Sequence, residues 1–373
     1  MLNHIEVMKA LQEQVTKLFV PLDDELTIAR HAWNQLVSDQ NLQIKLTNAR
    51  TQLMVPRWTD TIDAKFPVVE GPSAYHVIGI DGSQIYPDRH YSASCALINT
   101  GIVSLHYGAQ SRAHVASKPT VLIPAEIEQL PFTPDLINAR RQEFELAAAE
   151  SIESFGVKLN SDEETLFLFD GSLIFWHLQA YDEKMCAHFL TRYNQLLMHL
   201  FEQKKACAWF ISLPKSKELV NLVRLKLCNF NTDVCESFHA IDHLVDAHIA
   251  SFFLPNNHRS IVFEHRSKII AHYHEQVRPY FFYVHTENEI ARVELPAWLA
   301  GDEKKVSRIA HMIFDQMHKG YGYPVSLAEA HEQAVVKGPD REFFYHLLAK
   351  CSNDAGHSLS ISQKSAKKRR MNV

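Results

Sequence analysis

The first 70 residues carry apolar side chains at every third or fourth position, a spacing that predicts amphipathic helices. The first apolar stripe consists of Leu2, Ile5, Met8, Leu11, Val15, Leu18 and Phe19. Pro21 interrupts this stripe, and Asp23 and Asp24 suit the first turn of a second helix. The second stripe is Ala29, Trp33, Leu36 and Val37, continued by Leu42, Leu46 and Leu53. Two such helices predict a helical N-terminal arm or coiled-coil hairpin, with packing on their own domain as the alternative.

From about residue 74 the pattern changes to short apolar runs, which predict strands. Three runs follow one another at residues 76–80, 92–99 and 102–107. Thr100 and Gly101 separate the last two runs and predict the tight turn of an antiparallel hairpin. A strand is also predicted at 165–175, because residues 166–169 are all apolar, as in a strand covered on both faces. The last strand of this series is predicted at 206–213.

Helices are predicted between these strands. Thr133 suits an N-cap and Pro134 the first helical position. The apolar stripe of that helix is Ile137, Phe144, Ala148, Ile152 and Phe155. A second helix carries Leu196, Leu197, Leu200 and Phe201. The order β-β-β-α-β-α-β predicts an α/β fold, in which helices flank a mixed sheet.

The change in polarity along the chain predicts three parts. Residues 1–70 form the helical arm, and residues 71–351 form the main domain. Residues 352–373 are a polar tail that we expect to be disordered. The tail ends with the basic residues Lys364, Lys367, Lys368, Arg369 and Arg370.

Composition excludes several classes of protein. A chain of 373 residues that is 46% hydrophobic can bury a large core. Its six cysteines contain no C-x-x-C pair, so neither a disulfide framework nor a zinc site is expected. No apolar run reaches membrane-spanning length and no signal-peptide pattern is present, so we expect a cytoplasmic protein without a membrane segment. The formal net charge of -5 argues against a nucleic-acid binder that uses its whole surface, but not against a local groove.

The tripeptide Asp-Gly-Ser occurs twice, each time after a buried apolar run. Asp81 follows residues 77–80, and Asp170 follows residues 166–169. Carboxylates at neighbouring strand ends repel each other, so such a pair shares a proton or holds a cation. Oxygen ligands favour hard ions such as magnesium or manganese. We therefore expect Asp81 and Asp170 to end two strands at one site.

Spacing separates three enzyme classes that carry acids at strand ends. A haloacid-dehalogenase-type phosphatase needs a nucleophilic aspartate where this chain has Leu168. An actin-like ATPase has one residue between the aspartate and the glycine of its phosphate loop, whereas Asp81 directly precedes Gly82. RNase H-like nucleases place acids on the first strand, the first helix and the fourth strand, and another Asp or His late in the chain. The sequence fills each of these places, which favours the RNase H-like class.

The remaining candidate residues each have a structural alternative. Glu143 lies beside Phe144 at the edge of the helical stripe, whereas Glu145 and Glu150 lie farther round; a solvated helix face is the alternative. Asp242 and Asp246 flank a helical stripe in SFHAIDHLVDAHI, as candidate ligands or as solvated charges.

The stretch SLPKSKELV places two lysines just after a predicted strand. Lys215 and Lys217 could meet a phosphate there, with plain surface lysine as the alternative. Near the end of the chain, Ser326 and Glu329 form an S-x-x-E pattern that predicts a capping box and a helix start. His331 falls on the apolar side of that helix, either as a ligand or as a core residue.

In this order the motifs resemble the NurA nuclease family over about residues 74–350. They are IGIDGS, R-x-x-E from Arg140 to Glu143, LFDGSL, KSK, IDHLV and GYPVSLAEAH. By position, the resemblance implies a metal-binding catalytic set of Asp81, Glu143, Asp170, Asp242 and His331. Arg140, Lys215 and Lys217 would then contact the substrate.

The resemblance also implies an RNase H-like fold and an activity. It implies a DNA nuclease, exonuclease or endonuclease, that processes DNA ends in repair with manganese (Mn2+), magnesium (Mg2+) being the alternative. Two metal ions would hold the scissile phosphate. A homodimer docked on a HerA-type hexameric ATPase is implied as the working assembly. The alternative is a non-catalytic RNase H-like module that binds DNA or the ATPase.

Overall fold

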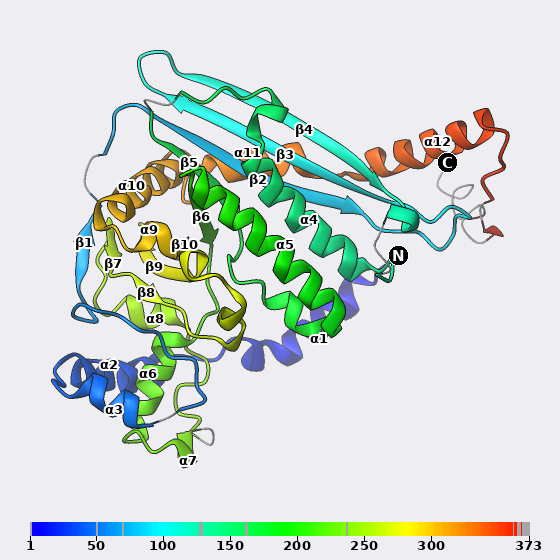
Figure 1. Cartoon of the computed structure of the whole chain (residues 1–373). Coiled ribbons are helices and arrows are strands. Elements are labelled where there is room, and N and C mark those ends of the chain that lie inside the picture. The colour runs from blue at the N-terminus through cyan, green and yellow to red at the C-terminus, as the bar shows by residue number, and fades with distance from the viewer. Residues whose placement is uncertain are drawn as a thin grey trace. The chain divides into compact units, whose positions relative to one another are not determined.

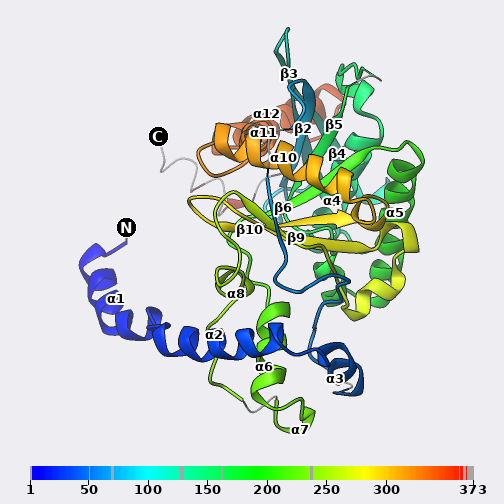
Figure 2. The same cartoon turned by 90° about the vertical axis from the view of Figure 1, so that its left-hand side faces the viewer.

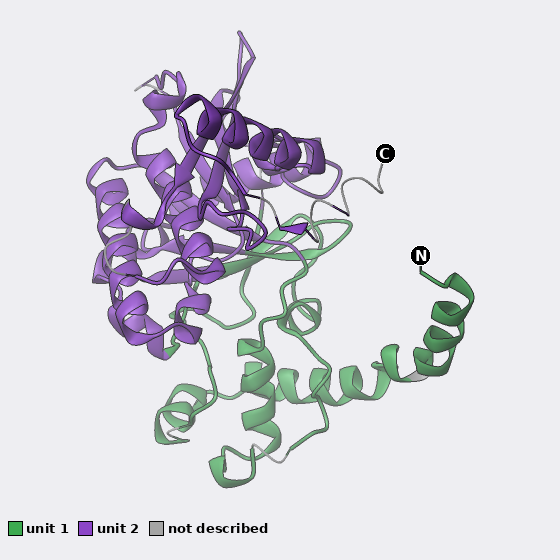
Figure 3. Cartoon of the chain, turned by 90° about the vertical axis from the view of Figure 1, so that its right-hand side faces the viewer, with its two compact units in different colours: residues 1–67, 213–267, 282–292 green, residues 68–212, 268–281, 293–373 purple. Residues whose placement is uncertain are grey.

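The chain folds into two units, each assembled from separate stretches of sequence. In the computed structural model, unit 1 comprises residues 1–67, 213–267 and 282–292, and unit 2 comprises residues 68–212, 268–281 and 293–373 (Figure 3). The structure describes residues 2–49, 51–68, 71–126, 130–160, 163–235, 238–360, 362, 363 and 367. The basic tail residues Lys364, Lys368, Arg369 and Arg370 lie outside the described residues.

Unit 2 is built on a mixed sheet (Figure 1). Its strands are β2 (Tyr75–Ile85), β3 (Ala96–Tyr107), β4 (Arg112–Leu122), β5 (Thr165–Asp170) and β6 (Ala206–Ile211), with part of β10 (Ile290–Pro296). They follow the order β10-β6-β5-β2-β3-β4. β2 is antiparallel to β3 and parallel to β5, and β5 is parallel to β6.

Helices cover both faces of these strands. They are α4 (Pro134–Glu150), α5 (Glu183–Glu202), α9 (Ala297–Ala300), α10 (Glu303–Lys319), α11 (Val325–Ala334) and α12 (Gly338–Asp354). Figure 2 shows α4 and α5 on one side of the strands and α10 and α11 on the other. The expected RNase H-like arrangement, a mixed sheet flanked by helices, is thus confirmed. The helix predicted to start at Pro134 also begins there, with Thr133 Oγ1 accepting from the backbone N–H of Leu136.

The hairpin turn predicted at Thr100 and Gly101 is wrong. β3 runs straight through both residues, and the chain turns instead after Gly108, whose φ is +148°. Gly101 is small because α11 crosses it: a Cβ there would lie 2.5 Å from the backbone nitrogen of Ala334. β2 likewise continues to Ile85, so Asp81 lies inside this strand and not at its end.

Unit 1 holds the N-terminal helices and two later stretches of the chain. Its elements are α1 (His4–Leu18), α2 (Asp23–Val37), α3 (Leu42–Ala49), β1 (Lys65–Pro67), α6 (Glu218–Leu227), α7 (Thr232–Cys235), α8 (Asp246–Ala250), β7 (His258–Ser260) and β8 (Phe263–Glu264). β9 (Pro279–His285) and β10 have residues in both units. β1, β7 and β9 are consecutive neighbours. The long helix expected around Ile241 and Ile249 is shorter, since only α8 is helical there and residues 240–243 form turns.

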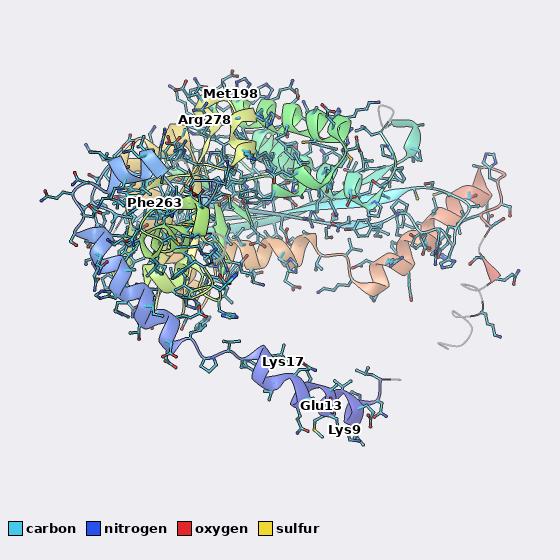
Figure 4. All side chains as sticks on the ribbon, turned by 90° about the horizontal axis from the view of Figure 1, so that it is seen from below. Lys9, Glu13, Lys17, Met198, Phe263 and Arg278 are labelled. Carbon is cyan, nitrogen blue, oxygen red and sulfur yellow. The ribbon has the colours of Figure 1, made fainter. Side chains whose placement is uncertain are left out.

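The first two helices behave differently from each other. α2 packs into unit 1 against α6, and its Trp33 ring stacks on Phe253 at 5.2 Å between centroids. α1 keeps its apolar stripe exposed, and Phe19 at its end is 75% exposed. Figure 4 shows the side chains of Lys9, Glu13 and Lys17, which recur every fourth residue along α1. Only α1 therefore has the exposed character expected of an arm.

Of the helices that the structure describes, none is both long enough and apolar enough to cross a bilayer.

Candidate active site

Two acids lie side by side on the central strands of unit 2. The parallel register pairs Ile80 of β2 with Phe169 of β5, so Asp81 and Asp170 are the next pair on adjacent strands. Neighbouring strands are about 4.8 Å apart. Burial raises the pKa of Asp170, and the charge of Asp81 raises it further, while a hydrogen bond from Tyr323 lowers it. The pair therefore has the electrostatic character of a cation-binding site.

Helix α11 lies against the backbone of β2 and β3, and two glycines allow this approach. A Cβ on Gly79 would lie 2.1 Å from the carbonyl oxygen of Ser326, and one on Gly101 would meet Ala334. The last turn of α11 is held by the sheet as well, because Ser83 Oγ donates to the carbonyl of Ala334 at 2.5 Å. Asn99 Nδ2 donates to the same carbonyl at 2.9 Å. These bonds satisfy carbonyls that a helix end leaves unpaired.

This packing brings His331 to Asp81. His331 Nδ1 lies 2.8 Å from Asp81 Oδ2, while Asp81 Oδ1 accepts the backbone N–H of Gly82 at 2.7 Å. The His331 side chain is 62% exposed, so the core alternative considered for it does not hold. Its other ring nitrogen, Nε2, is not used in this hydrogen bond to Asp81.

Glu145 approaches the same acids from α4, on the opposite face of β2. The absence of a side chain at Gly82 makes room for it, since a Cβ there would lie 2.6 Å from Glu145 Oε1. Burial raises the pKa of Glu145 to about 8, with Asp81 and Asp170 raising it and Arg141 opposing them. Arg141 Nε lies 3.4 Å from Glu145 Oε1. Glu145 is therefore the acid of α4 that the structure groups with Asp81 and Asp170.

Glu143, the acid singled out from the sequence, has a different environment. It is buried, and its carboxylate accepts from Arg140 Nη1 at 2.6 Å and from Arg192 Nε at 2.7 Å. Both of its oxygens are thus used by guanidinium groups of α4 and α5. Arg140, expected to contact substrate, is engaged in the same ion pair. The structure therefore corrects the position on α4 from Glu143 to Glu145.

Tyr323 is a site residue that the sequence reasoning missed, since it assigned Tyr323 only a role in the path of the chain into α11. Its hydroxyl hydrogen-bonds to the side chain of Asp170, and its ring makes an edge contact with Phe210 on β6. The signal was its place in GYGYP, just before the helix that carries His331. The capping box predicted beside it is wrong: Pro324 is the N-cap of α11, and Ser326 lies within the helix with its hydroxyl buried.

A buried glutamate shapes the turn that follows Asp170. Glu294 is 1% exposed, and its Oε2 accepts from Ser172 Oγ and from the backbone N–H of Leu173, both at 2.8 Å. Gly171, at φ +91°, adopts the left-handed conformation that the turn needs. The second Asp-Gly-Ser motif is thus held by the strand that carries Glu294, β10.

The other candidates from the sequence belong to unit 1. Asp242 accepts from Arg224 Nη2 and pairs with His239 Nδ1, both at 2.6 Å. Lys217 Nζ donates to the backbone carbonyl of Asp242 at 2.6 Å, and Lys215 is exposed. The structure does not group these residues with Asp81.

Asp246, the other late acid, has a structural role in unit 1. It is fully buried and accepts the backbone N–H groups of Glu218, Leu219 and Val220 at 2.7 to 2.9 Å. These are the first residues of α6, so Asp246 satisfies donors that a helix start leaves unpaired.

The chemistry of the unit 2 residues suits a divalent ion. In the described part of the chain, no group of three or more His, Cys, Asp or Glu residues is already arranged to hold a metal. Nevertheless, Asp81, Asp170 and Glu145 repel one another, and Glu145 is nearly buried. A cation would relieve that repulsion, and carboxylate oxygens with an imidazole nitrogen are donors for manganese or magnesium. The residues therefore fit such an ion in type and charge.

Comparison with known proteins gives one family. The family model of the NurA domain matches residues 75–336, which include Asp81, Glu145, Asp170, Tyr323 and His331. No curated protein sequence matches the chain.

Three solved structures are similar to the chain. The first is the NurA nuclease from Sulfolobus solfataricus, with 16% identity, a TM-score of 0.49, and coverage of 87% of this chain and 97% of that one. NurA with manganese is 12% identical, with a TM-score of 0.39 and coverage of 93% and 98%. NurA bound to dAMP and manganese is 12% identical, with a TM-score of 0.37 and coverage of 88% and 94%.

Proposed function

The chain belongs to the NurA family, and on that premise we propose that it is a metal-dependent DNA nuclease that hydrolyses phosphodiester bonds. One observation carries the proposal: Asp81, Asp170 and His331 meet from three separate elements of unit 2. Glu145 adds a buried acid from a fourth element.

The residues would divide the work as follows. Asp81, Asp170 and Glu145 would hold divalent ions, manganese first and magnesium as the alternative, with His331 beside them. Two such ions would supply an activated water and neutralise charge on the leaving oxygen. Gly82 N–H and His331 orient the two oxygens of Asp81, and Tyr323 orients Asp170. Glu294 holds the turn after Asp170 in place.

A plasmid-nicking assay with manganese tests the activity. Wild-type protein should convert supercoiled DNA to nicked or linear forms, whereas Asp81→Ala and Asp170→Ala should each abolish conversion. Lys304→Ala, on the surface of α10, is the matched control and should cleave like wild type. Retained cleavage in both acid variants would contradict the site assignment. No cleavage by wild type, with DNA binding retained, would favour the non-catalytic module.

We also propose that the protein works in DNA end processing as a homodimer with a HerA-type ATPase, and that α1 contributes to these contacts. The exposed apolar stripe of α1 supports this part of the proposal. Deletion of residues 1–20 keeps α2, whose Trp33 is needed in the core of unit 1. The shortened protein should still cleave DNA but should elute as a monomer and fail to co-elute with the ATPase. Unchanged elution of the shortened protein would exclude α1 from these interfaces.

A further inference from the structure

A basic cavity of about 690 Å³ lies next to the proposed active site, within unit 2. It is lined by residues 84–90 together with Val336, Lys337, Gly338 and Arg341. Both walls continue elements that carry site residues. β2 runs from Asp81 to Gln84, about 10 Å at 3.3 Å per residue. α11 carries His331 and ends at Ala334, just before Val336. A strand of nucleic acid leaving the site along these elements would enter the cavity.

The charges in the cavity favour an anion. Arg89, Lys337 and Arg341 face a single carboxylate, Asp88, in a chain whose formal net charge is -5. Asp88 Oδ1 accepts the backbone N–H of His90 at 2.9 Å, and its Oδ2 accepts from Arg341 Nη2 at 3.2 Å. Lys337 pairs with Glu332 at 3.0 Å, but both side chains are exposed, so this pair is weak and can exchange for a phosphate.

The walls of the cavity are held by packed aromatic rings. Tyr91 and Tyr345 stack with centroids 4.0 Å apart and planes 6° from parallel. The Arg341 guanidinium lies 5.9 Å from the centre of the Tyr345 ring. α12, which carries Arg341 and Tyr345, is thereby fixed against the segment that follows β2.

Tyr86 adds an aromatic surface at the rim. It is 37% exposed, and its hydroxyl donates to Asn138 Oδ1 at 2.6 Å and accepts from Gln84 Nε2 at 2.8 Å. Gln84 Oε1 accepts in turn from Arg141 Nη1 at 3.3 Å, and Arg141 pairs with Glu145. Exposed aromatic rings beside cations are the means by which proteins hold single-stranded nucleic acid, with bases stacked and phosphates paired.

We propose that this cavity binds the phosphodiester backbone of a single-stranded segment adjacent to the scissile bond, with one base stacked on Tyr86. The proposal rests on the proposed nuclease function and adds the form of the substrate. Arg89 and Arg341 supply the phosphate contacts, and Lys337 supplements them.

Binding of a fluorescent oligothymidine, measured by anisotropy without divalent metal across a salt series, tests the charges. Arg89→Ala/Arg341→Ala should lower affinity about tenfold and make the slope of log K against log salt shallower by about 1, because each phosphate contact on a single strand contributes about 0.7. Lys304→Ala/Lys305→Ala removes the same charge from α10 and should leave both quantities unchanged. Equal losses in the two variants, or none, would overturn the proposal. If the double variant melts early, Arg89→Ala alone carries the test with a smaller loss.

Substitutions of Tyr86 and a change of ligand test the single-stranded form. Tyr86→Phe keeps the stacking ring and should bind like wild type, whereas Tyr86→Ala should lose affinity several-fold. An equal loss on blunt duplex DNA would overturn the single-strand assignment. The plasmid assay separates the two proposals: cleavage by wild type with unaltered binding by the arginine variants refutes the cavity alone. Charge-dependent binding without any cleavage refutes the nuclease alone.

Discussion

His331 Nδ1 lies 2.8 Å from Asp81 Oδ2, although 250 positions separate the two residues in the chain. The contact depends on α11 resting on Gly79 and Gly101, so the position of His331 is set by backbone packing. The histidine is also largely exposed. It therefore contributes little to the core, and its effect on cleavage can be separated from its effect on stability.

His331→Ala should lower the cleavage rate by roughly 10- to 100-fold or more, the usual effect of losing a ligand or its orienting partner. The melting temperature should change little. Glu332→Ala, the next residue on α11 and also exposed, is the control and should retain activity. A large drop in melting temperature with normal cleavage per folded molecule would assign His331 a structural role.

Glu145→Gln and Glu143→Gln should have opposite effects. Glu145→Gln should abolish most cleavage without loss of stability, because burial already favours the neutral form of this side chain. Glu143→Gln should lose roughly 1–3 kcal/mol of unfolding free energy, because Arg140 and Arg192 lose their charged partner, yet should still cleave DNA. Paired urea melts and nicking rates decide the matter, and the reverse pattern would restore Glu143 as the site residue.

Manganese should stabilise the folded protein even without DNA. An ion that binds only the folded state contributes about 2.7 kcal/mol at a hundredfold excess over Kd. The melting temperature should therefore rise by a few degrees, more with manganese than with calcium. Asp81→Asn should remove most of this shift, while the metal-free variant melts no lower than metal-free wild type because a repelling charge is gone. Equal shifts in wild type and variant would place the ion elsewhere.

The stability of unit 2 should fall in mild acid through His76. Burial lowers the pKa of this histidine to about 4, and the nearby charges of His106 and Arg112 act in the same direction. The unfolded chain takes up the proton near pH 6.5, so the contribution is complete above that pH and is lost as the pH falls towards 4. This group alone should make the protein roughly 2 kcal/mol less stable at pH 5 than at pH 7.

Urea melts of wild type and His76→Gln across this pH range measure the effect. The variant loses the contact between His76 Nε2 and Ser104 Oγ, which is 2.6 Å long, so its stability is lower at pH 7. Its dependence on pH should nevertheless be flatter than that of wild type. Parallel slopes for the two proteins would show that other groups cause the acid sensitivity.

Local signals in the sequence predicted the elements that local interactions determine. Thr133 and Pro134 marked the start of α4, and the apolar run before Asp170 marked β5. Gly101 was misread because its reason is tertiary: it is small for α11 and does not form a turn. Ser326 and Glu329 match a capping pattern, but Pro324 ends the preceding loop and starts the helix two residues earlier.

The candidate site shows the same limit. The repeated Asp-Gly-Ser motif was enough to select Asp81 and Asp170, which the parallel register then brings together. Choosing between Glu143 and Glu145 required knowing which side of α4 faces Gly82 and which faces Arg192 on α5. Tyr323 carries no local mark of its role, because its partner Asp170 lies far away in sequence.

The late position of α11 in the chain has a consequence for biosynthesis. Translation delivers β2 and β5 early, and α11 leaves the ribosome only after most of the chain has been made. A nascent chain that stops before Val325 holds Asp81 and Asp170 but lacks His331, and the backbone of Gly79 and Gly101 stays uncovered. Under the proposed function, an incomplete translation product would therefore be inert towards DNA, and the last large helix to meet the sheet would complete the enzyme.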